Sequence, residues 1–253
     1  MSTVHIIMPM AGEGSRFKKE GYSVPKPLIE LNDRELYKHA LDSLNMLDAD
    51  EFKHTFIVRE EFYDIISKQI LESYPNANIL SVKETTKGAL ETVMLAEDYI
   101  EDDDYVIVMD CDLEFKSEEF IEELNDAINN IEPMLLSFYS RDPKYSFVSC
   151  NAYGDVLLVA EKELISTHAI GGCYCLGSGK LFKKCAKMYI YDFYKGKINS
   201  PEIYISLIYN YIINECETSV NVYDMNFHKD HYWSYGTPYD LEHYNYDKNI
   251  WDK

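Results

Sequence analysis

The chain has 253 residues, 46% of them hydrophobic and 27% charged, and its formal net charge is −20. This composition is ordinary for a globular protein of one large domain or two small ones. The acidic balance argues against an extended nucleic-acid interface, because phosphate backbones require basic surface, but a few local cations can still bind small phosphorylated ligands. No apolar run approaches the roughly 18 residues that a membrane span needs, and no signal-peptide pattern is visible. We therefore expect a cytoplasmic protein with no membrane partner.

Buried strands and amphipathic helices alternate through the first part of the chain. Apolar runs suited to strands begin at Val4, Thr55, Asn78, Tyr105 and Met134. Apolar stripes with helical spacing lie between consecutive strands, in the segments 36–47, 62–70, 90–100 and 120–128. Strands separated by helices of this length predict βαβ units and a largely parallel sheet.

The pattern changes after about residue 145. Residues 147–163 predict a hairpin with its turn at Gly154, residues 169–176 predict a strand, and a helix is expected over about Glu202 to Asn214. No repeat or flexible linker divides the chain. We therefore expect one domain over residues 1–253, with an α/β fold: a Rossmann-like αβα sandwich with a mixed, mainly parallel central sheet.

A glycine loop follows the first strand, in the sequence PMAGEGSRF, and VPKPL comes soon after. Phe17 stands where a dinucleotide-binding loop needs its third glycine, and no Gly-Lys-Ser/Thr follows as in an ATP-binding P-loop. A plain structural turn is the remaining alternative. Gly12 and Gly14 would let backbone amides approach a phosphate closely, and Arg16 and Lys26 could neutralise it. The loop thus favours a phosphate site.

A second polar motif, DCD, follows the fourth predicted strand. Ligands of open α/β sheets bind beyond the carboxyl ends of the strands, so this motif should lie near the glycine loop. Mg²⁺ prefers one or two carboxylates together with phosphate oxygens and water. We expect Asp112 to be a Mg²⁺ ligand and Asp110 to lie beside the metal or the nucleotide. A solvated turn at the strand end is the alternative.

Together these motifs resemble the signature of the nucleotidylyltransferases that join an NTP to a sugar phosphate or a related phosphorylated metabolite. MAGEGSRF…PKPL is followed, in the family's order, by TTKGALETV, VIVMDCD, VAEKELIS…AIGGCYCL, PEIYIS and WSYGTPYDL, over nearly the whole chain. The resemblance implies a Mg²⁺-dependent reaction that releases pyrophosphate. About residues 1–140 would bind the NTP and about 141–253 the phosphorylated acceptor. Whether the protein forms a homo-oligomer is left open.

The resemblance also implies a role for individual residues. Arg16 would neutralise the departing pyrophosphate, and Lys26 would bridge the reacting phosphates. The nucleotide site would contain Met10, Ala11, Gly12, Gly14, Ser15, Arg16, Thr86, Gly88 and Asp110. The acceptor site would contain Tyr145, Glu161, Lys162, Gly172, Tyr174 and Glu202.

Two positions depart from the family's pattern. Ser234 stands where relatives often have the second metal-binding aspartate, and Asp230 is the expected substitute. Glu163 replaces the proline of the usual Glu-Lys-Pro. Within the family, the chain is similar to the CTP-dependent phosphoglutamine cytidylyltransferases of capsule and surface-polysaccharide pathways. There, Glu163 or Glu202 would bind an ammonium or amide group of the acceptor.

Several alternatives stay open. The main alternative acceptor is a hexose 1-phosphate, in a uridylyl-, cytidylyl- or thymidylyltransferase reaction. A second alternative is a non-catalytic nucleotide-binding regulatory protein, which is favoured by Ser234 in place of the metal-binding aspartate. A glycosyltransferase that uses Asp110 and Asp112 as a D-x-D metal motif is a third, although Arg16 and Pro-Lys-Pro do not belong to that pattern.

Overall fold

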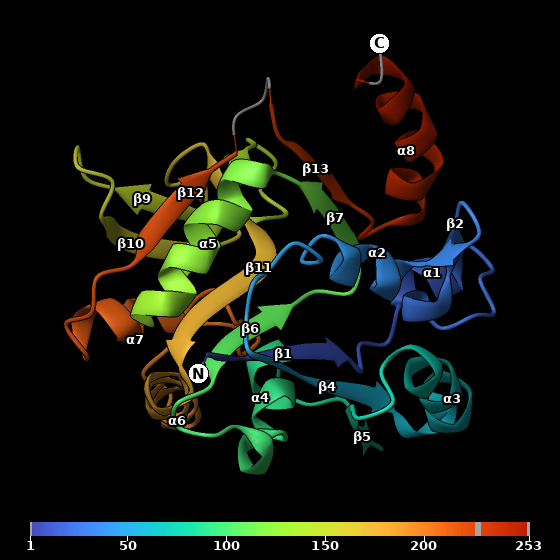
Figure 1. The fold of residues 1–253 in the computed structure, drawn as a ribbon, viewed down its shortest axis with the longest axis horizontal. Helices are drawn as coiled ribbons and strands as arrows, with labels where there is room; N and C mark the ends of the chain where they lie inside the picture. Colours follow the sequence, from blue (N-terminus) through green and yellow to red (C-terminus); the bar gives the residue numbers. More distant parts are fainter. Residues whose placement is uncertain (1, 226–228, 252–253) are drawn as a thin grey trace.

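A mixed sheet runs through the protein. The structure is a computed structural model that describes residues 2–225 and 229–251. Nine of the strands in these ranges form this sheet (Figure 1). Its parallel part contains, in spatial order, β6 (Tyr105–Met109), β1 (Thr3–Met10), β4 (Glu51–Arg59) and β5 (Asn78–Val82).

A long strand, β11 (His168–Ser178), joins the second part of the sheet to the first by running antiparallel to β6. Beyond it lie β8 (Met134–Tyr139), β9 (Ser146–Cys150), β10 (Val156–Glu161) and β12 (Asn221–Asp224). β12 runs parallel to β8, whereas β8 and β9 run antiparallel to β11. The expected Rossmann-like α/β fold with a mixed, mainly parallel central sheet is confirmed.

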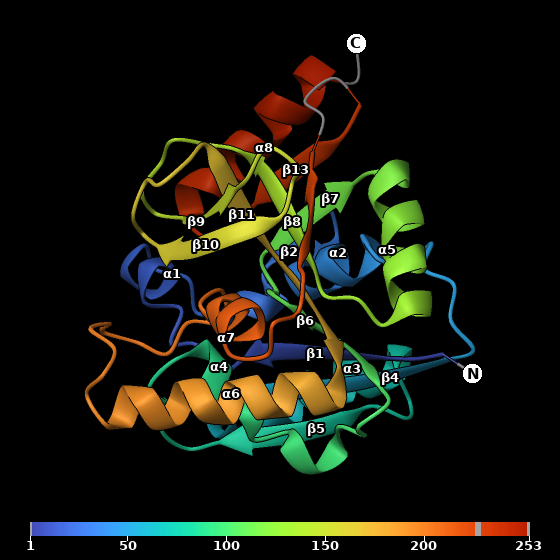
Figure 2. The ribbon, with the colours of Figure 1, turned by 90° about the vertical axis from the view of Figure 1, so that its left-hand side faces the viewer.

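Helices cover both faces of the sheet. One face carries α2 (Leu36–Asp42), α3 (Tyr63–Ser73) and α5 (Glu118–Asn130), and the other carries α4 (Ala89–Met94), α6 (Gly179–Tyr194) and α7 (Ile208–Asn214), as Figure 2 shows for α5 against α6 and α7. Two cores result. Ile6 and Met8 of β1 belong to the first core and Ile7 to the second, because successive side chains of a strand point to opposite faces.

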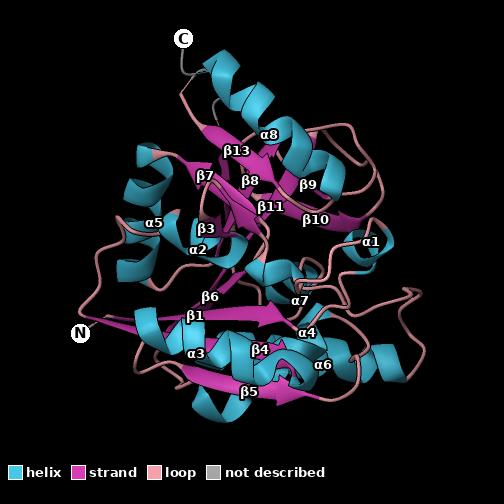
Figure 3. Ribbon diagram, turned by 90° about the vertical axis from the view of Figure 1, so that its right-hand side faces the viewer, coloured by secondary structure: helices cyan, strands magenta, loops and turns pink. Residues whose placement is uncertain are grey.

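A smaller third core joins the segment after the glycine loop to the C-terminal helix. The strands β7 (Leu113–Lys116) and β13 (His231–Ser234) form an antiparallel ladder beside α8 (Pro238–Trp251) (Figures 1 and 3). A short hairpin of β2 (Glu30–Leu31) and β3 (Arg34–Glu35) lies nearby. Phe17 and Leu36 are buried there with Tyr235 and Tyr244. Burial of such side chains contributes about 1.5–3 kcal/mol each, which holds α8 against the N-terminal segment.

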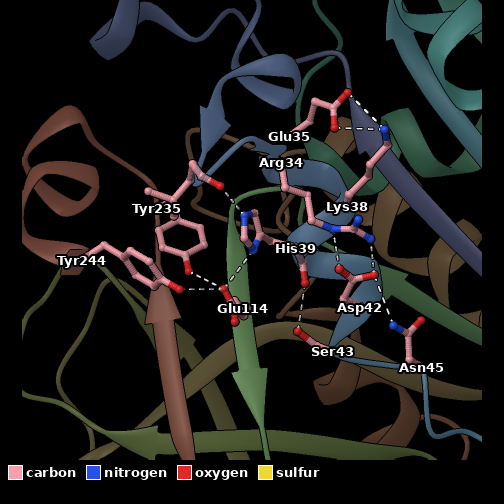
Figure 4. A network of polar contacts seen from close by, with 11 residues as sticks. Arg34, Glu35, Lys38, His39, Asp42, Ser43, Asn45, Glu114, Tyr235 and Tyr244 are labelled. Carbon is pink, nitrogen blue, oxygen red and sulfur yellow. Dashed lines mark hydrogen bonds and ion pairs between the residues drawn. The ribbon is translucent and has the colours of Figure 1, made fainter. Parts of the chain in front are cut away.

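A buried polar network supports the same contact (Figure 4). The Glu114 carboxylate of β7 accepts hydrogen bonds from the hydroxyls of Tyr235, at 2.8 Å, and Tyr244, at 3.4 Å. Its Oε2 also lies 3.0 Å from Nδ1 of His39 on α2. The other ring nitrogen of His39 lies 2.9 Å from the carbonyl oxygen of Leu31. Since a carbonyl can only accept, Nε2 of His39 carries a proton.

Most of the predicted elements occur where the sequence placed them. The strands expected at Asn78 and Met134 and the hairpin turning at Gly154, whose φ is 90°, are all present. The helix that begins at Leu36 is shorter than its apolar stripe, since it ends at Asp42, and the rest of the stripe is buried in the turns that follow.

The predicted helix over Glu202 to Asn214 is wrong in its first half, because α7 begins only at Ile208. Residue Ile203 instead runs beside the segment before α4. Its N–H donates to the carbonyl of Lys87, at 2.8 Å, and its carbonyl accepts from the N–H of Leu90, at 3.1 Å. Within the described ranges, no helix is long and apolar enough to cross a bilayer.

Candidate active site

The glycine loop and the DCD motif are neighbours, because β1 and β6 are adjacent parallel strands. β1 ends at Met10 and β6 at Met109, and each polar segment follows directly. Gly14 has the left-handed backbone angles φ 60° and ψ 30° at the start of α1 (Ser15–Lys19). This conformation favours glycine. The fold therefore brings the two motifs together at the carboxyl ends of the strands.

Lys26 lies between two prolines in the 3-10 helix η1 (Lys26–Leu28), and its ammonium is ion-paired with the carboxylate of Asp112. The two side chains are only 23% and 19% exposed. Burial alone would lower the pKa of Lys26, but the charge of Asp112, with a smaller effect of Asp110, raises it. Lys26 is therefore a positive charge at the ends of β1 and β6.

Asp110 is packed against Gly172 of β11. The N–H of Asp110 donates to the carbonyl of Gly172, at 2.7 Å. A Cβ atom on Gly172 would lie 2.4 Å from Oδ2 of Asp110 and 2.7 Å from Leu113, so no larger side chain fits. Burial and the neighbouring charge of Asp112 raise the pKa of Asp110 to about 7. An added cation would favour the ionised form of this carboxylate.

Oxygen atoms converge on the space beside Gly236. A Cβ atom on Gly236 would lie 3.5 Å from Oδ2 of Asp112, 3.6 Å from Oγ of Ser234 and 3.8 Å from Oδ2 of Asp240. With Asp110 nearby, these are oxygen atoms of the kind that Mg²⁺ takes as ligands together with phosphates and water. Across residues 2–225 and 229–251, no group of three or more His, Cys, Asp or Glu is arranged to hold a metal. Ion binding here would therefore depend on the ligand's phosphates.

Asp230, the expected substitute for the second metal ligand, does not share a site with Asp112. β13 pairs with β7 so that Ser234 lies at the end next to Asp112, whereas Asp230 lies beyond the opposite end. Ser234 and Asp230 are thus separated by roughly 13 Å of strand. Asp230 is buried and accepts a hydrogen bond from Tyr223, at 2.8 Å. The prediction is wrong because it followed the spacing in sequence and ignored the direction of the strand.

One cavity, of about 480 Å³, joins the glycine loop to the TTKG segment. Its lining includes Ala11, Gly12, Thr86, Gly88 and Glu202. A Cβ atom on Gly88 would lie 2.4 Å from the carbonyl oxygen of Ile203, so a glycine lets the two backbones approach. Met10 is buried at the end of β1, whereas Ser15 and Arg16 are exposed on α1.

A second cavity, of about 240 Å³, opens beside the two aspartates. Its lining includes Asp110, Asp112, Tyr145, Glu161, Gly172 and Tyr174. The hydroxyls of Ser146 and Ser206 both donate to Oε2 of Glu161, the second at 2.8 Å, which orients this carboxylate. Ala89 lines both cavities. The two cavities are therefore adjacent, and we call them the nucleotide cavity and the acceptor cavity.

Three charged residues that were expected to bind the acceptor, two glutamates and one lysine, do not line the acceptor cavity. Glu202 lines the nucleotide cavity instead, and Glu163 is exposed. Lys162 has a φ of 56°, and its Nζ donates to the hydroxyl of Tyr204, at 2.8 Å. This Nζ also lies 4.5 Å from the centre of the Tyr204 ring. The acceptor cavity is thus built partly from other residues.

The sequence reasoning missed several residues of the acceptor cavity: Lys144, Ser146, Tyr204, Ser206 and Tyr232. In the run Ile203 to Ser206, both isoleucines are buried in the second core, and Ile205 also lines the cavity beside Tyr204 and Ser206. No local pattern marks Tyr204 and Ser206, because residues 202–214 match a helical period.

The fold is shared with solved nucleotidyltransferase structures. A nucleoside-diphosphate-sugar pyrophosphorylase from Vibrio cholerae RC9 is 21% identical with a TM-score of 0.73, over 98% of this chain and 100% of that one. A structure described as a glucose-1-phosphate thymidylyltransferase, from Bacillus anthracis, is 19% identical with a TM-score of 0.76, over 100% and 96%. The inositol-1-phosphate CTP transferase of T. maritima is 17% identical with a TM-score of 0.72, over 99% and 96%.

The sequence itself gives the family. No curated protein matches the chain at a significant level. The family model of the MobA-like NTP transferase domain, however, matches residues 6–166, which include the glycine loop, Lys26, the DCD motif and Glu161. The protein is therefore a nucleotidyltransferase that belongs to the family of MobA-like NTP transferase domains.

Proposed function

We propose that the protein is a Mg²⁺-dependent nucleotidylyltransferase that joins CTP to a phosphorylated metabolite and releases pyrophosphate. The placement of Lys26 carries this proposal. A Cβ atom on Gly14 of the glycine loop would lie 3.6 Å from the Cβ of Lys26, and the Lys26 ammonium is paired with Asp112 of the acceptor cavity. Lys26 thus lies between the glycine loop and Asp112, which lines the acceptor cavity.

The chemistry needs charge neutralisation more than proton transfer. An oxygen of the acceptor phosphate attacks the α-phosphorus of the NTP, and the bond to pyrophosphate breaks. This oxygen is already anionic near neutral pH, so no general base is required. The barrier comes from bringing two polyanions together in line, which positioned cations reduce. Lys26 would lie between the two phosphates and Arg16 beside the pyrophosphate, while Mg²⁺ held by Asp112 and Asp110 would supply further positive charge.

The lining of the nucleotide cavity supports CTP among the pyrimidine nucleotides. Glu13 and Glu202 both line this cavity, together with Thr86. Their carboxylate and hydroxyl oxygens can accept hydrogen bonds from the exocyclic amine of cytosine, a donor that uracil and thymine lack at this position. One solved structure of the same fold is titled an inositol-1-phosphate CTP transferase. CTP is therefore the nucleotide to test first.

Phosphoglutamine, in capsule or surface-polysaccharide biosynthesis, is the proposed acceptor. The acceptor cavity offers the Glu161 carboxylate, which two serine hydroxyls orient, to an ammonium or amide of an amino-acid phosphate. Glu161 takes this part instead of Glu163 or Glu202, which lie elsewhere. A hexose 1-phosphate is the second candidate, because two of the structures that share the fold are named for sugar nucleotides or glucose 1-phosphate. Hydroxyl groups of a sugar could also donate to Glu161.

The test is pyrophosphate release from CTP, UTP, dTTP, ATP and GTP, each with Mg²⁺ and with phosphoglutamine, glucose 1-phosphate or inositol 1-phosphate. We expect the fastest release from CTP with phosphoglutamine and none after chelation of Mg²⁺. The Lys26→Met variant serves as the inactive control. No release from any pair by a folded protein that binds nucleotide would instead indicate a regulatory protein, and transfer from a nucleotide sugar would indicate a glycosyltransferase.

A further inference from the structure

A lysine that the family resemblance did not single out lines the acceptor cavity. Lys144 lies in the loop between β8 and β9, and its side chain is 35% exposed. Its Nζ lies 3.4 Å from Oδ1 of Asp240 in the first turn of α8. The other oxygen of Asp240 accepts a hydrogen bond from Thr237, at 2.7 Å. This bond keeps the Asp240 carboxylate, and hence Lys144, in place.

The contact with Asp240 places Lys144 on the Asp112 side of the cavity. Oδ2 of Asp240 and Oδ2 of Asp112 both lie within 4 Å of the position that a Cβ on Gly236 would occupy. Asp112 is in turn the partner of Lys26. The ammonium of Lys144 therefore lies near the region where the acceptor's phosphate must meet the nucleotide.

The charge of the cavity favours a further cation beside Lys26. Its lining residues, all of which the structure describes, include the carboxylates of Asp110, Asp112 and Glu161, and Lys144 is the one lysine or arginine among them. A phosphate carries about 1.5 to 2 negative charges near pH 7, so these carboxylates would repel it. Burial alone would lower the pKa of Lys144, but Tyr145 and Asp240 raise it. Lys144 is charged when the acceptor arrives.

Lys162, the lysine that the resemblance assigns to the acceptor, is placed less well for this task. It does not line the cavity, and its side chain is 49% exposed. Its ammonium is bound to the hydroxyl of Tyr204, at 2.8 Å, and stacked over the ring. Lys144 also has contacts, with Asp240, with Asp142 at 3.7 Å and with the Tyr145 ring at 5.0 Å. It lines the cavity, however, and Lys162 does not.

We infer that Lys144 binds the phosphate group of the acceptor substrate and that Asp240 positions its ammonium beforehand. The inference rests on the proposed function, since it assumes a phosphorylated acceptor. It adds a residue that determines specificity for a phosphorylated metabolite over the free metabolite. A charge-assisted hydrogen bond of this kind changes affinity by about tenfold or more.

The test measures binding without turnover. Line broadening in ³¹P NMR reports the binding of phosphoglutamine and glucose 1-phosphate, with Mg²⁺ and α,β-methylene CTP present so that no reaction occurs. The full chain is compared with Lys144→Met, which keeps a long apolar side chain but removes the charge. Lys162→Met gives the comparison with the rival lysine, and Lys116→Met, an exposed lysine of β7 outside the cavity, gives the matched control.

We expect Lys144→Met to weaken binding of the tighter of the two phosphorylated probes at least tenfold, with affinity for the CTP analogue changed less than twofold. Lys144→Arg should restore part of the loss, and Lys116→Met should bind as the unaltered chain does. Unchanged affinity of Lys144→Met for that probe would overturn the inference, as would failure of the unaltered chain to bind either phosphorylated probe. Pyrophosphate release with another acceptor would show in that case that the proposed function survives.

Discussion

The ammonium of Lys26 is ion-paired with the carboxylate of Asp112, and this contact joins two segments 86 residues apart in the chain. The pair forms because η1 follows the glycine loop at the end of β1, while Asp112 follows the adjacent strand β6. Without substrates, the lysine that would bridge the phosphates is thus held by the aspartate that would hold the metal. When substrates and Mg²⁺ bind, this ion pair must be replaced by a contact between Lys26 and the phosphates and one between Asp112 and the metal.

The first prediction concerns that pair. Lys26→Met should reduce pyrophosphate release by about 10²–10³-fold or more, because a positioned charge facing the reacting phosphates is lost. The variant should also unfold more easily in the absence of Mg²⁺, by about 1–3 kcal/mol, since Asp112 is left partly buried without its partner. Addition of Mg²⁺ should reverse part of this loss.

Stopped assays of pyrophosphate release and urea unfolding measure the two effects. Lys197→Met is the matched control: Lys197 also forms an ion pair, at 2.6 Å with Asp192, but its side chain is 61% exposed, so the variant should barely change stability and should leave turnover intact. Turnover by Lys26→Met at the rate of the unaltered chain would refute its assigned role.

The second prediction concerns Gly172. A Cβ there would lie 2.4 Å from Oδ2 of Asp110, so Gly172→Ala must displace this carboxylate. A shift of about 1 Å in a positioned group can reduce turnover by about 10²-fold, and overpacking of this kind typically costs about 1–3 kcal/mol of stability.

The neighbouring Gly171 provides the control on the same strand. Its added Cβ would lie 3.1 Å from the ring of Tyr232 and 3.2 Å from Leu136, so small movements of side chains can accommodate it. Kinetics and thermal unfolding of the two alanine variants separate the effects. Gly171→Ala should retain more activity than Gly172→Ala, and the reverse order would show that Asp110 does not need its present position.

The third prediction tests which aspartates act with the metal. Asp112→Asn should raise the Mg²⁺ concentration needed for half-maximal activity by about tenfold or more, since Mg²⁺ binds carboxylates far better than amides. Asp230→Asn should leave that concentration unchanged and cost about 1 kcal/mol of stability, because it weakens the hydrogen bond from Tyr223. Mg²⁺ titrations of pyrophosphate release decide. An increased Mg²⁺ requirement in Asp230→Asn would show that Asp230 is a metal ligand after all, against the strand register.

The fold could be predicted from local patterns wherever burial and periodicity agree. The strands at 78–82 and 134–139 are short apolar runs, and the structure gives them the predicted bounds. The segment 202–207 failed because Ile203, Leu207 and Ile208 also match a helical period. The non-helical course of this segment at Ile203 depends on hydrogen bonds to Lys87 and Leu90, more than a hundred residues away, and no local pattern reveals such partners.

In the candidate site, too, local motifs could be predicted, whereas contacts between distant segments could not. The motif residues at strand ends could be predicted, because the parallel arrangement of β1 and β6 brings Lys26 and Asp112 together. The direction of the Lys162 side chain could not, since it depends on a positive φ and on Tyr204, which lies inside the segment that was predicted as helix. Lys144 was missed for a related reason. Its place in the cavity depends on Asp240 of the C-terminal helix, a contact between distant segments.

The last prediction concerns the pH dependence of stability at the Glu114 network (Figure 4). Burial alone would lower the pKa of His39, but the hydrogen bonds to Glu114 and to the carbonyl of Leu31 raise it above its ordinary value of 6.5. A raised pKa in the folded state means that the protonated ring stabilises the fold. This contribution is complete below pH 6.5 and is lost as the pH rises through the higher, folded value.

Thermal unfolding from pH 5.5 to 8.5, a range of about three units around the reference pKa of His, measures this effect against His39→Gln. Glutamine keeps a hydrogen-bond donor but cannot take up a proton. The Tm advantage of the unaltered chain over His39→Gln should therefore shrink as the pH rises, because deprotonated His39 no longer faces the Glu114 carboxylate as a cation. His243→Gln, which removes an exposed histidine of α8, is the control and should run parallel to the unaltered chain. A Tm advantage that stays constant or grows with pH would mean that His39 is neutral beside Glu114.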